Sequence, residues 1–405
     1  MSDTDIRPTG ALRSDIRSGP GSNRTDDTPR VSSALSREPR ITLRAQPSGD
    51  DGSLQTTDRP NQHSGSLSVR GRNASGGGRA DGHTLRSARG RDDLDGPNFD
   101  INVPENGYAW WYIDGLSDDH KQAVSVIGFI GSVFSPWYAW SGRRRPANHC
   151  CINVATYGKG GRFAMTDRGA AALRTTRNTF QVGPSQIRWD GRSLIIDIDE
   201  ISSLPLISRM RGQIKVTPSA LTTVELPLAA DGTHVWRPFG PISKIEVDMG
   251  PGQEWTGKGY FDANFGMRAL EQDFNDWTWA CFPRSSGATA FYDVTRRDGS
   301  KFETSIGFAA DGHARHIDAP RQVRFRNSLW QVARATRADT GTTPRQILNM
   351  LDAPFYSRSA VQTQLDGETT VGVHEALDLR RFAHPLLKPM LAVRVPRRPG
   401  WRHPD

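Results

Sequence analysis

Every Trp, Tyr and Phe of the 405-residue chain lies at Phe99 or later, and this uneven distribution limits which part of the chain can fold. Residues 1–98 consist mainly of Ser, Gly, Arg, Asp and Thr with scattered single aliphatic residues. Such a segment cannot bury enough apolar surface to offset the conformational entropy that folding removes. The sequence therefore predicts a disordered N-terminal extension over residues 1–98 and a folded region from Phe99 onward.

Short apolar or aromatic runs separated by turn residues recur throughout the folded region. Asp-Gly pairs, which tight β-hairpins prefer, stand at residues 190–191, 231–232, 298–299, 311–312 and 366–367. Apolar residues alternate around one of these pairs between Tyr292 and Ile306, which predicts a hairpin. Helical signals are confined to Gly169–Arg177 and Thr343–Leu351. We therefore expect an all-β protein built from antiparallel strands that form barrels or sandwiches.

The folded region is long enough for two β domains. About 300 residues of short strands exceed the needs of one small barrel. A break near Gly250-Pro251-Gly252 divides the region into a first domain at 99–250 and a second at 251–400. His234 and Trp236 then fall late in the first domain and Asp262 early in the second. A site formed by these residues is therefore expected at the junction, where pockets are common.

Charge and cysteine content narrow the choice of partners and compartment. The net charge is +8, with Arg clusters at Arg143–Arg145 and Arg394–Arg402, so we expect an anionic membrane surface as a partner. Arg and Asp are interspersed in the extension, which is therefore not a basic arm, and we expect no nucleic-acid partner. Three cysteines, two of them adjacent, do not form a secreted disulfide framework and favour a reducing cytoplasm. The sequence contains no C-x-x-C or H-E-x-x-H motif, so we expect no metal site.

One uncharged segment, Ala123–Trp140, approaches the minimum length of a membrane-spanning helix. Its glycines, serines, Pro136 and β-branched residues instead favour a buried strand, a turn at Ser135-Pro136 and a second aromatic segment. That second segment, Pro136–Trp140, is suited to a membrane interface, where amphipathic rings are favoured.

The strongest functional candidate is Asp262, which stands in an aromatic neighbourhood. In an extended segment Tyr260, Asp262 and Asn264 share one face, and His234 and Trp236 share another. A carboxyl group buried among rings tends to keep its proton, and the rings can stabilise a passing cation. From the residues alone, a structural Asp that accepts backbone hydrogen bonds is an equal alternative.

A second aromatic face contains Tyr108, Trp110, Tyr112 and Asp114. It is either a ring-lined ligand wall with Asp114 at its mouth or a set of core aromatics with a turn-forming Asp before Gly115. The residues that we expect to contact a substrate are Trp110, Tyr112, Trp255 and Asn264.

Several motifs occur together in a recognisable order. They are NGYAWWYIDGLSDD, FIGSVFSPWYAW, NHCCINVATYG, THVWRP, and GKGYFDANFG followed by DWTWA. This combination resembles the carotenoid 1,2-hydratases, also called hydroxyneurosporene synthases. The resemblance spans roughly Phe99 to Arg398 and does not cover the first 98 residues.

The resemblance implies a two-domain lipocalin-like β-fold and an activity that uses no redox cofactor or metal. The implied reaction adds water across the terminal C1=C2 double bond of acyclic carotenoids, such as neurosporene and lycopene in purple bacteria, and makes the enzyme a hydro-lyase. The family's functional His-x-Trp and Gly-Tyr-x-Asp-x-Asn segments correspond here to His234, Trp236, Tyr260 and Asp262. Broader relatives often carry Glu before the paired tryptophans; this chain has Ala109, so no carboxylate role transfers there.

These residues support a mechanism in which Asp262 protonates C2 and a tertiary cation forms at C1. Trp236 and Tyr260 would stabilise the cation, each by about 1–2 kcal/mol. Water then attacks C1, Asn264 could orient it, and either His234 or Asp262 removes the surplus proton. Two alternatives stay open: a lipocalin-like carrier of a carotenoid or other isoprenoid, and a pericyclase or isomerase on the same fold. Because the substrate lies in a bilayer, we expect a cytoplasmic protein attached peripherally to the inner, photosynthetic membrane.

Overall fold

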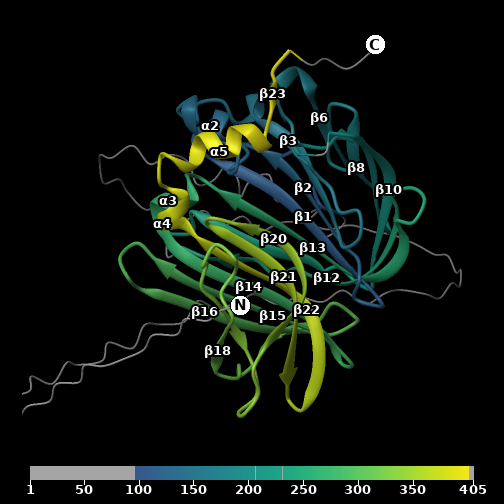
Figure 1. Cartoon of the computed structure of the whole chain (residues 1–405), viewed down its shortest axis with the longest axis vertical. Coiled ribbons are helices and arrows are strands. Elements are labelled where there is room, and N and C mark those ends of the chain that lie inside the picture. The colour runs from purple at the N-terminus through teal and green to yellow at the C-terminus, as the bar shows by residue number, and fades with distance from the viewer. Residues whose placement is uncertain (1–95, 206, 230, 401–405) are drawn as a thin grey trace, which may run out of the picture. The chain divides into compact units, whose positions relative to one another are not determined.

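The computed structural model describes residues 96–205, 207–229 and 231–400 (Figure 1). The disordered extension predicted for residues 1–98 lies outside the described residues, except for its last three. Of these, Pro97 accepts a hydrogen bond from Trp111 Nε1 at 3.1 Å. Phe99, at which the sequence predicts that the folded region begins, is fully buried.

Fourteen strands of the described residues form the first sheet, drawn in blue to green in Figure 1 except for the yellow C-terminal strand β23. Along the sheet they are β23 (Arg397–Arg398), β5 (Asp167–Arg168), β3 (Cys150–Tyr157), β2 (Ala123–Ile130), β1 (Tyr108–Ser117), β13 (Glu254–Gly266), β12 (His234–Asp248), β10 (Arg209–Pro218), β9 (Leu194–Ile201), β8 (Ser185–Trp189), β7 (Thr179–Val182) and β6 (Leu173–Thr176), with β4 (Phe163–Ala164) on β3 and β11 (Leu226–Pro227) on β12. All pairs are antiparallel except β23 with β5.

A second sheet contains seven of the described strands, and a two-stranded ribbon accompanies it (Figure 1). The sheet runs β17 (Ala314–His316), β16 (Lys301–Phe308), β15 (Gly287–Arg296), β14 (Phe274–Arg284), β22 (Glu368–Asp378), β21 (Tyr356–Leu365) and β20 (Arg345–Ala353), and the ribbon is β18 (Gln322–Phe325) with β19 (Arg334–Arg337). The short helices are α2 (Pro136–Trp140), η2 (Pro146–Asn148), η3 (Ala170–Ala172), α3 (Leu270–Asp273), α4 (Leu379–Phe382) and α5 (Leu387–Arg394). The prediction of an all-β, antiparallel protein is confirmed. Both sheets keep free edges and form no closed barrel within the described residues.

Strand β1 is buried on both faces, and each face belongs to a different core. On one face Trp111 contacts Phe180 of β7 with ring centroids 5.2 Å apart, so the first sheet curves back on itself around this core. On the other face Tyr112 contacts Trp279 of β14 at 5.8 Å. That second core is the layer between the two sheets, which we call the inter-sheet layer, and the functional candidates lie in it.

The segment Gly250-Pro251-Gly252, where the sequence predicts a domain break, lies in the turn between β12 and β13. Strands β12 and β13, which this turn connects, are antiparallel neighbours in the first sheet. The chain passes to the second sheet later, between Gly266 and Phe274. The predicted boundary therefore lies inside one hairpin, and the division into two domains stays a prediction.

Local predictions differ in outcome. The hairpin around Asp298-Gly299 is confirmed as β15–β16, and Ala123–Trp140 divides into strand β2 and the short helix α2. The predicted helix at Thr343–Leu351 is wrong, because most of this segment forms strand β20, paired with β21. Gly169–Arg177 forms only the 3₁₀ turn η3 and strand β6. None of the described helices is long and apolar enough to cross a membrane.

Candidate active site

Asp262 lies in the middle of β13, with its side chain in the inter-sheet layer and only 4% exposed. Trp236 Nε1 and the Tyr260 hydroxyl each donate a hydrogen bond of 2.9 Å to its Oδ2 atom. Asn264 Nδ2 donates to its Oδ1 atom at 3.1 Å. The period of two along β13 places Tyr260, Asp262 and Asn264 on one face, as predicted. Trp236 reaches Asp262 from the neighbouring strand β12, where it is paired with Asn264.

The surroundings of Asp262 favour the neutral acid. Burial is the largest influence and raises the pKa of its carboxyl group well above the usual 3.8, although the hydrogen bonds from Trp236 and Tyr260 oppose this. The negative charges of Glu375 and Asp114 add to the increase. A carboxylic acid held in this way can donate a proton at neutral pH.

An aromatic layer surrounds the acid. Tyr260 contacts Trp279 of the second sheet with ring centroids 4.8 Å apart, and Trp236 contacts Tyr292 at 5.3 Å. Tyr112 lies 6.2 Å from Tyr260. Because these rings are buried and come from both sheets, they can enclose an apolar end group and stabilise a positive charge near the acid.

His234 belongs to the same face of β12 as Trp236 but not to the immediate surroundings of Asp262. It is paired with Gly266, four residues beyond Asp262 on β13. Its Nδ1 atom lies 2.8 Å from the Tyr108 hydroxyl, and its Nε2 atom lies 2.6 Å from Asp273 Oδ2. Both ring nitrogens therefore have partners away from the acid.

Asp273 stabilises this arrangement as an ionised partner. Burial raises the pKa of its carboxyl group, but hydrogen bonds from His234 and Arg268 outweigh burial and lower the pKa to about 2. Arg268 Nε donates to Asp273 Oδ2 at 2.6 Å. Asp273 and Arg268 were not predicted from the sequence, and no local motif marks them.

The structure divides the four predicted substrate-contacting residues. Asn264 contacts Asp262 directly, and Tyr112 is paired with Asp262 across β1 and β13. Trp110 lies two pairs further along, opposite Asn264, and stacks on Tyr108 with ring centroids 4.7 Å apart. Trp255 packs against the core inside the curved first sheet, because it lies an odd number of residues from Asp262 and so on the opposite face of β13.

Sequence reasoning missed residues of the second sheet and left the role of Asp114 on β1 open. Trp279 and Tyr292 form part of the aromatic layer. The alternating pattern of the sequence places both residues on strands, but it does not show that the second sheet packs against the first. Asp114 is not a turn residue before Gly115: it lies within β1 and is 3% exposed. Nearby, the buried Arg358 forms an ion pair of 2.6 Å with the half-buried Glu375.

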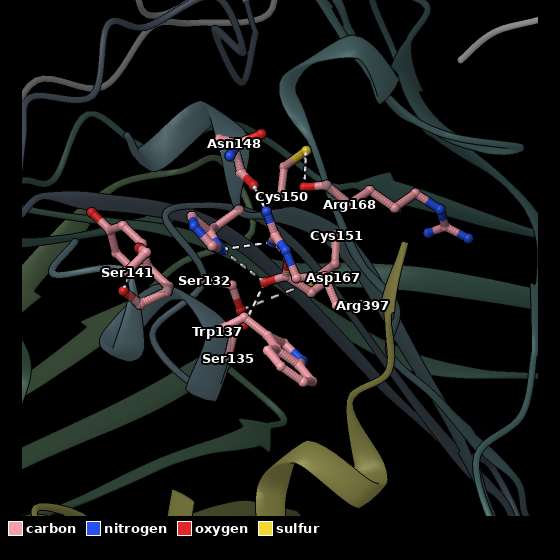
Figure 2. A network of polar contacts seen from close by, with 12 residues as sticks. Ser132, Ser135, Trp137, Ser141, Asn148, Cys150, Cys151, Asp167, Arg168 and Arg397 are labelled. Atoms are coloured by element: carbon pink, nitrogen blue, oxygen red, sulfur yellow. Dashed lines mark hydrogen bonds and ion pairs between the residues drawn. The ribbon is translucent and has the colours of Figure 1, made fainter. Parts of the chain in front are cut away.

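A second buried polar network lies in the first sheet, away from Asp262 (Figure 2). The carboxylate of Asp167 accepts hydrogen bonds from Ser135 and from Arg397 of the C-terminal strand β23. His149 Nδ1 lies 3.4 Å from Asp167, while the Ser135 hydroxyl is bonded to Asp167 rather than to the histidine. This is not the pairing of a nucleophile with a base. Through Arg397 and Asp167 the network holds strand β23 against β5.

The adjacent thiols of Cys150 and Cys151 are also buried, and burial is the main cause that raises the pKa of Cys150 to about 12. It raises the pKa of Cys151 well above its usual value. Neither thiol is therefore a ready nucleophile. No cluster of His, Cys, Asp and Glu among the described residues is arranged to hold a metal ion.

Fold and site together define an all-β protein with a buried carboxyl group that is enclosed by aromatic rings and has a raised pKa, an arrangement suited to proton-initiated chemistry on an apolar molecule. The family model for carotenoid hydratase CrtC matches residues 126–404. An acyclic carotenoid 1,2-hydratase of Cereibacter sphaeroides is 62% identical over 276 residues, 68% of this chain and 99% of that protein. One of Thiocapsa roseopersicina is 41% identical over 398 residues, 97% of this chain and 98% of that protein. The chain belongs to the carotenoid hydratase CrtC family.

A further relative and one solved structure are also similar to this chain. The acyclic carotenoid 1,2-hydratase of Rhodobacter capsulatus is 56% identical over 281 residues, which cover 69% of this chain and 100% of that protein. A solved structure described as AttH from Nitrosomonas europaea covers 67% of this chain and 92% of its own, with 15% identity and a TM-score of 0.49.

Proposed function

We propose that this chain is an acyclic carotenoid 1,2-hydratase, a hydro-lyase that adds water across the terminal C1=C2 double bond of neurosporene, lycopene or a related acyclic carotenoid. Membership of the carotenoid hydratase family supports this activity. The observation that carries the proposed chemistry is the buried Asp262 carboxyl group, which the environment keeps protonated inside an aromatic layer.

In the proposed mechanism the Asp262 O–H group gives its proton to C2 of the substrate. The electron pair of the double bond forms the new C2–H bond and leaves a tertiary cation at C1. The neighbouring rings of Trp236 and Tyr260 stabilise that cation, each by about 1–2 kcal/mol in a dry site. A water molecule then bonds to C1 through its oxygen and releases one proton. No step requires a metal or a redox cofactor.

Positioning contributes as much as acidity, because an alkene is a very weak base. Trp236, Tyr260 and Asn264 hold both carboxyl oxygens of Asp262 in place through hydrogen bonds. A preorganised donor in a site that excludes bulk water avoids the cost of reorganising solvent during proton transfer.

We further propose that the protein docks on an anionic bilayer, from which it takes its substrate. Helices α2 and α5 contact each other, and Trp137 Nε1 donates to the Val395 carbonyl at 2.7 Å. Arg394 donates to the Leu204 carbonyl at 2.6 Å and so joins the loop between β9 and β10 to α5. The exposed apolar side chains of these three segments, which we call the docking patch, are Trp140, Leu204, Ile207, Leu386, Met390 and Val393.

Charge and position both favour a lipid surface as the occupant of the docking patch. Arg144 and Arg145 are exposed just beyond α2, and Arg398 is exposed just beyond α5, so anionic headgroups complement the patch. On its inner side α5 packs against the inter-sheet layer through Leu387 and Leu391. A polyene leaving the bilayer beneath α5 would therefore meet the layer that contains Asp262.

The proposed function is tested by expressing the full chain in a lycopene-producing host and analysing the pigments. We expect a new carotenoid whose mass exceeds that of lycopene by one water for each hydrated end. An isomer of unchanged mass would instead support a pericyclase or isomerase. Unchanged lycopene bound to the purified protein would support a carrier. Either result would contradict the hydratase.

A further inference from the structure

A cavity of about 170 Å³ lies between the two sheets at one end of the inter-sheet layer. The residues that line it include Lys258 and Asp118, which are exposed to solvent. The buried side chains of Asp114 and Tyr260 also line it. Cys281 and Val373 contribute the wall from the second sheet. The cavity therefore connects solvent with Tyr260, the residue whose hydroxyl is bonded to Asp262.

The register of β1 against β13 shows how close this cavity comes to the acid. Three successive pairs face the inter-sheet layer: Leu116 with Lys258, Asp114 with Tyr260, and Tyr112 with Asp262. Alternate pairs along a strand are separated by roughly 7 Å. The pair that contains Asp114, on the cavity wall, is thus the next pair on this face after the pair that contains Asp262.

The two carboxyl groups are linked by a reciprocal pair of tyrosines. Tyr112, which is paired with Asp262, donates its hydroxyl to Asp114 Oδ2 at 2.8 Å. Tyr260, which is paired with Asp114, donates its hydroxyl to Asp262 Oδ2 at 2.9 Å. Each carboxyl group therefore accepts a hydrogen bond from the tyrosine of the other pair. This arrangement orients both acids toward the same part of the layer.

We propose that the cavity admits the attacking water and that Asp114 is the base that accepts a proton from it, an inference that rests on the proposed hydration. The water oxygen forms its bond to C1 while one O–H bond breaks and the proton passes to the Asp114 carboxylate. Asp262, which has given its proton to C2, is then an anion. Transfer of the proton from Asp114 to Asp262 through cavity water restores both groups, so one water is consumed and no proton is gained or lost.

The alternatives for the base are less well placed. Both ring nitrogens of His234 have partners, and neither partner is Asp262 or Asp114. Asp262 already accepts three hydrogen bonds, two of them at Oδ2. In contrast, Asp114 has one side-chain hydrogen-bond partner among the described residues, Tyr112, and lies on the wall of the cavity that water can enter. Trp279, which contacts Tyr112 and Tyr260, has a buried Nε1 without a hydrogen-bond partner among the described residues, so the layer next to these tyrosines contains an unsatisfied donor.

The charge environment of Asp114 separates its role from that of Asp262. Burial is the main cause that raises the pKa of Asp114 to about 7; the Tyr112 hydrogen bond and Arg358 lower it, and Glu375 raises it. A substantial fraction of Asp114 is therefore ionised at neutral pH, whereas Asp262 favours its protonated form. Two carboxyl groups with different environments can serve as base and acid in one site. The titratable or charged groups around Asp114 are Tyr112 on β1, Asp118 and His120 after it, Lys258, Tyr260 and Asp262 on β13, Cys281 on β14, Arg358 on β21 and Glu375 on β22.

The first test compares the pH dependence of wild type and Asp114→Asn, using full-length protein, detergent-dispersed lycopene and product mass as the readout. Wild-type kcat should rise with pH through about 7, because the base must be ionised. Asp114→Asn should lose at least ~100-fold in kcat, as expected on removal of a general base, and the remaining rate should no longer depend on pH in that range. Circular dichroism and lycopene binding should match wild type.

A second variant keeps the test decisive even if Asp114→Asn fails to fold. Tyr112→Phe removes the hydroxyl that lowers the pKa of Asp114, so the rise in kcat should move to higher pH. The matched control is Asp293→Asn, which alters another buried carboxyl group whose pKa burial raises. Asp293 is bonded to Arg337 on the opposite face of β15 from Tyr292, so its variant should keep the wild-type pH profile.

The outcomes separate this inference from the proposed function. Wild-type product together with an unchanged pH profile in Asp114→Asn, or in Tyr112→Phe, overturns the assignment of Asp114 and leaves the hydratase intact. Absence of any hydrated product from wild type overturns the proposed function and this inference with it. If the rise of kcat with pH is lost in Asp114→Asn and moves to higher pH in Tyr112→Phe, the results support Asp114 as the base.

Discussion

At the scale of single residues, the proposed chemistry depends on two carboxyl groups that are buried at an energetic cost. Asp262 and Asp114 both have pKa values above that of a solvated Asp, and burial is the largest cause for each. Such groups hold a proton in the folded protein at a pH where they would lose it in the unfolded chain. The same property that makes them useful for proton transfer therefore makes the fold sensitive to rising pH.

This cost predicts a pH dependence of stability that differs between wild type and Asp114→Asn. The folded-state pKa of Asp114 is raised from 3.8 to about 7, so the folded state binds the extra proton in this window and the free energy of unfolding falls as pH rises through it. The contribution of this group is roughly 4 kcal/mol at most, at about 1.4 kcal/mol per pKa unit.

The measurement is urea unfolding at several pH values from about 4 to about 8, with the slope of unfolding free energy against pH as the readout. The unfolding free energy of Asp114→Asn should fall less steeply with rising pH than that of wild type. Identical slopes in the two proteins would contradict the shifted ionisation of Asp114.

At the scale of secondary-structure elements, strand register decides which predicted residues meet. The period of two was enough to place Tyr260 and Asp262 on one face, and the same period places Trp255 on the other. Register between strands could not be derived from sequence, and it sets His234 opposite Gly266 rather than beside Asp262. The helix expected at Thr343–Leu351 failed for a related reason: local signals were overridden by pairing with β21.

The position of His234 predicts a structural role for it. His234→Ala removes the partner of both Tyr108 and Asp273, and leaving buried polar groups unpaired costs about 1–3 kcal/mol. We expect a lower Tm, a reduced kcat, and an unchanged rise of kcat with pH.

Thermal unfolding and a pH series of initial rates check this prediction, with His316→Ala as the control because that histidine is exposed on β17. If His234→Ala kept the wild-type Tm but lost the rise of kcat with pH, His234 rather than Asp114 would be the base.

At the scale of the whole described molecule, the inter-sheet layer has two different ends. At one end the cavity beside Asp114 reaches exposed polar residues. At the other, helices α4 and α5 pack against the layer, and the docking patch lies on the outer side of α5. We infer that water and polyene approach Asp262 from opposite ends, which keeps the acid away from bulk solvent while both reactants are delivered.

The docking patch predicts binding to vesicles that contain phosphatidylglycerol. Met390 and Val393 are 48% and 60% exposed, and burying an apolar side chain of this size contributes about 1.5–3 kcal/mol. The double variant Met390→Asp/Val393→Asp should therefore bind these vesicles at least ~10-fold more weakly. It should still hydrate lycopene dispersed in detergent.

Vesicle flotation measures this difference, and Leu329→Asp is the control because Leu329 is 84% exposed outside the docking patch. Wild-type binding should weaken as salt increases. Equal flotation of wild type and the double variant would show that the bilayer is held by another surface.

The most direct test of the central claim is the rate of lycopene hydration by purified Asp262→Asn compared with wild type. Asn keeps the size of the side chain and a carbonyl oxygen for Trp236 and Tyr260, but it has no acidic proton to give. We predict a loss of about 10²–10⁴-fold in kcat, the range expected for a general acid, with Tm and lycopene binding preserved. Hydration at the wild-type rate by a folded Asp262→Asn protein would contradict the claim that Asp262 protonates the carotenoid end group.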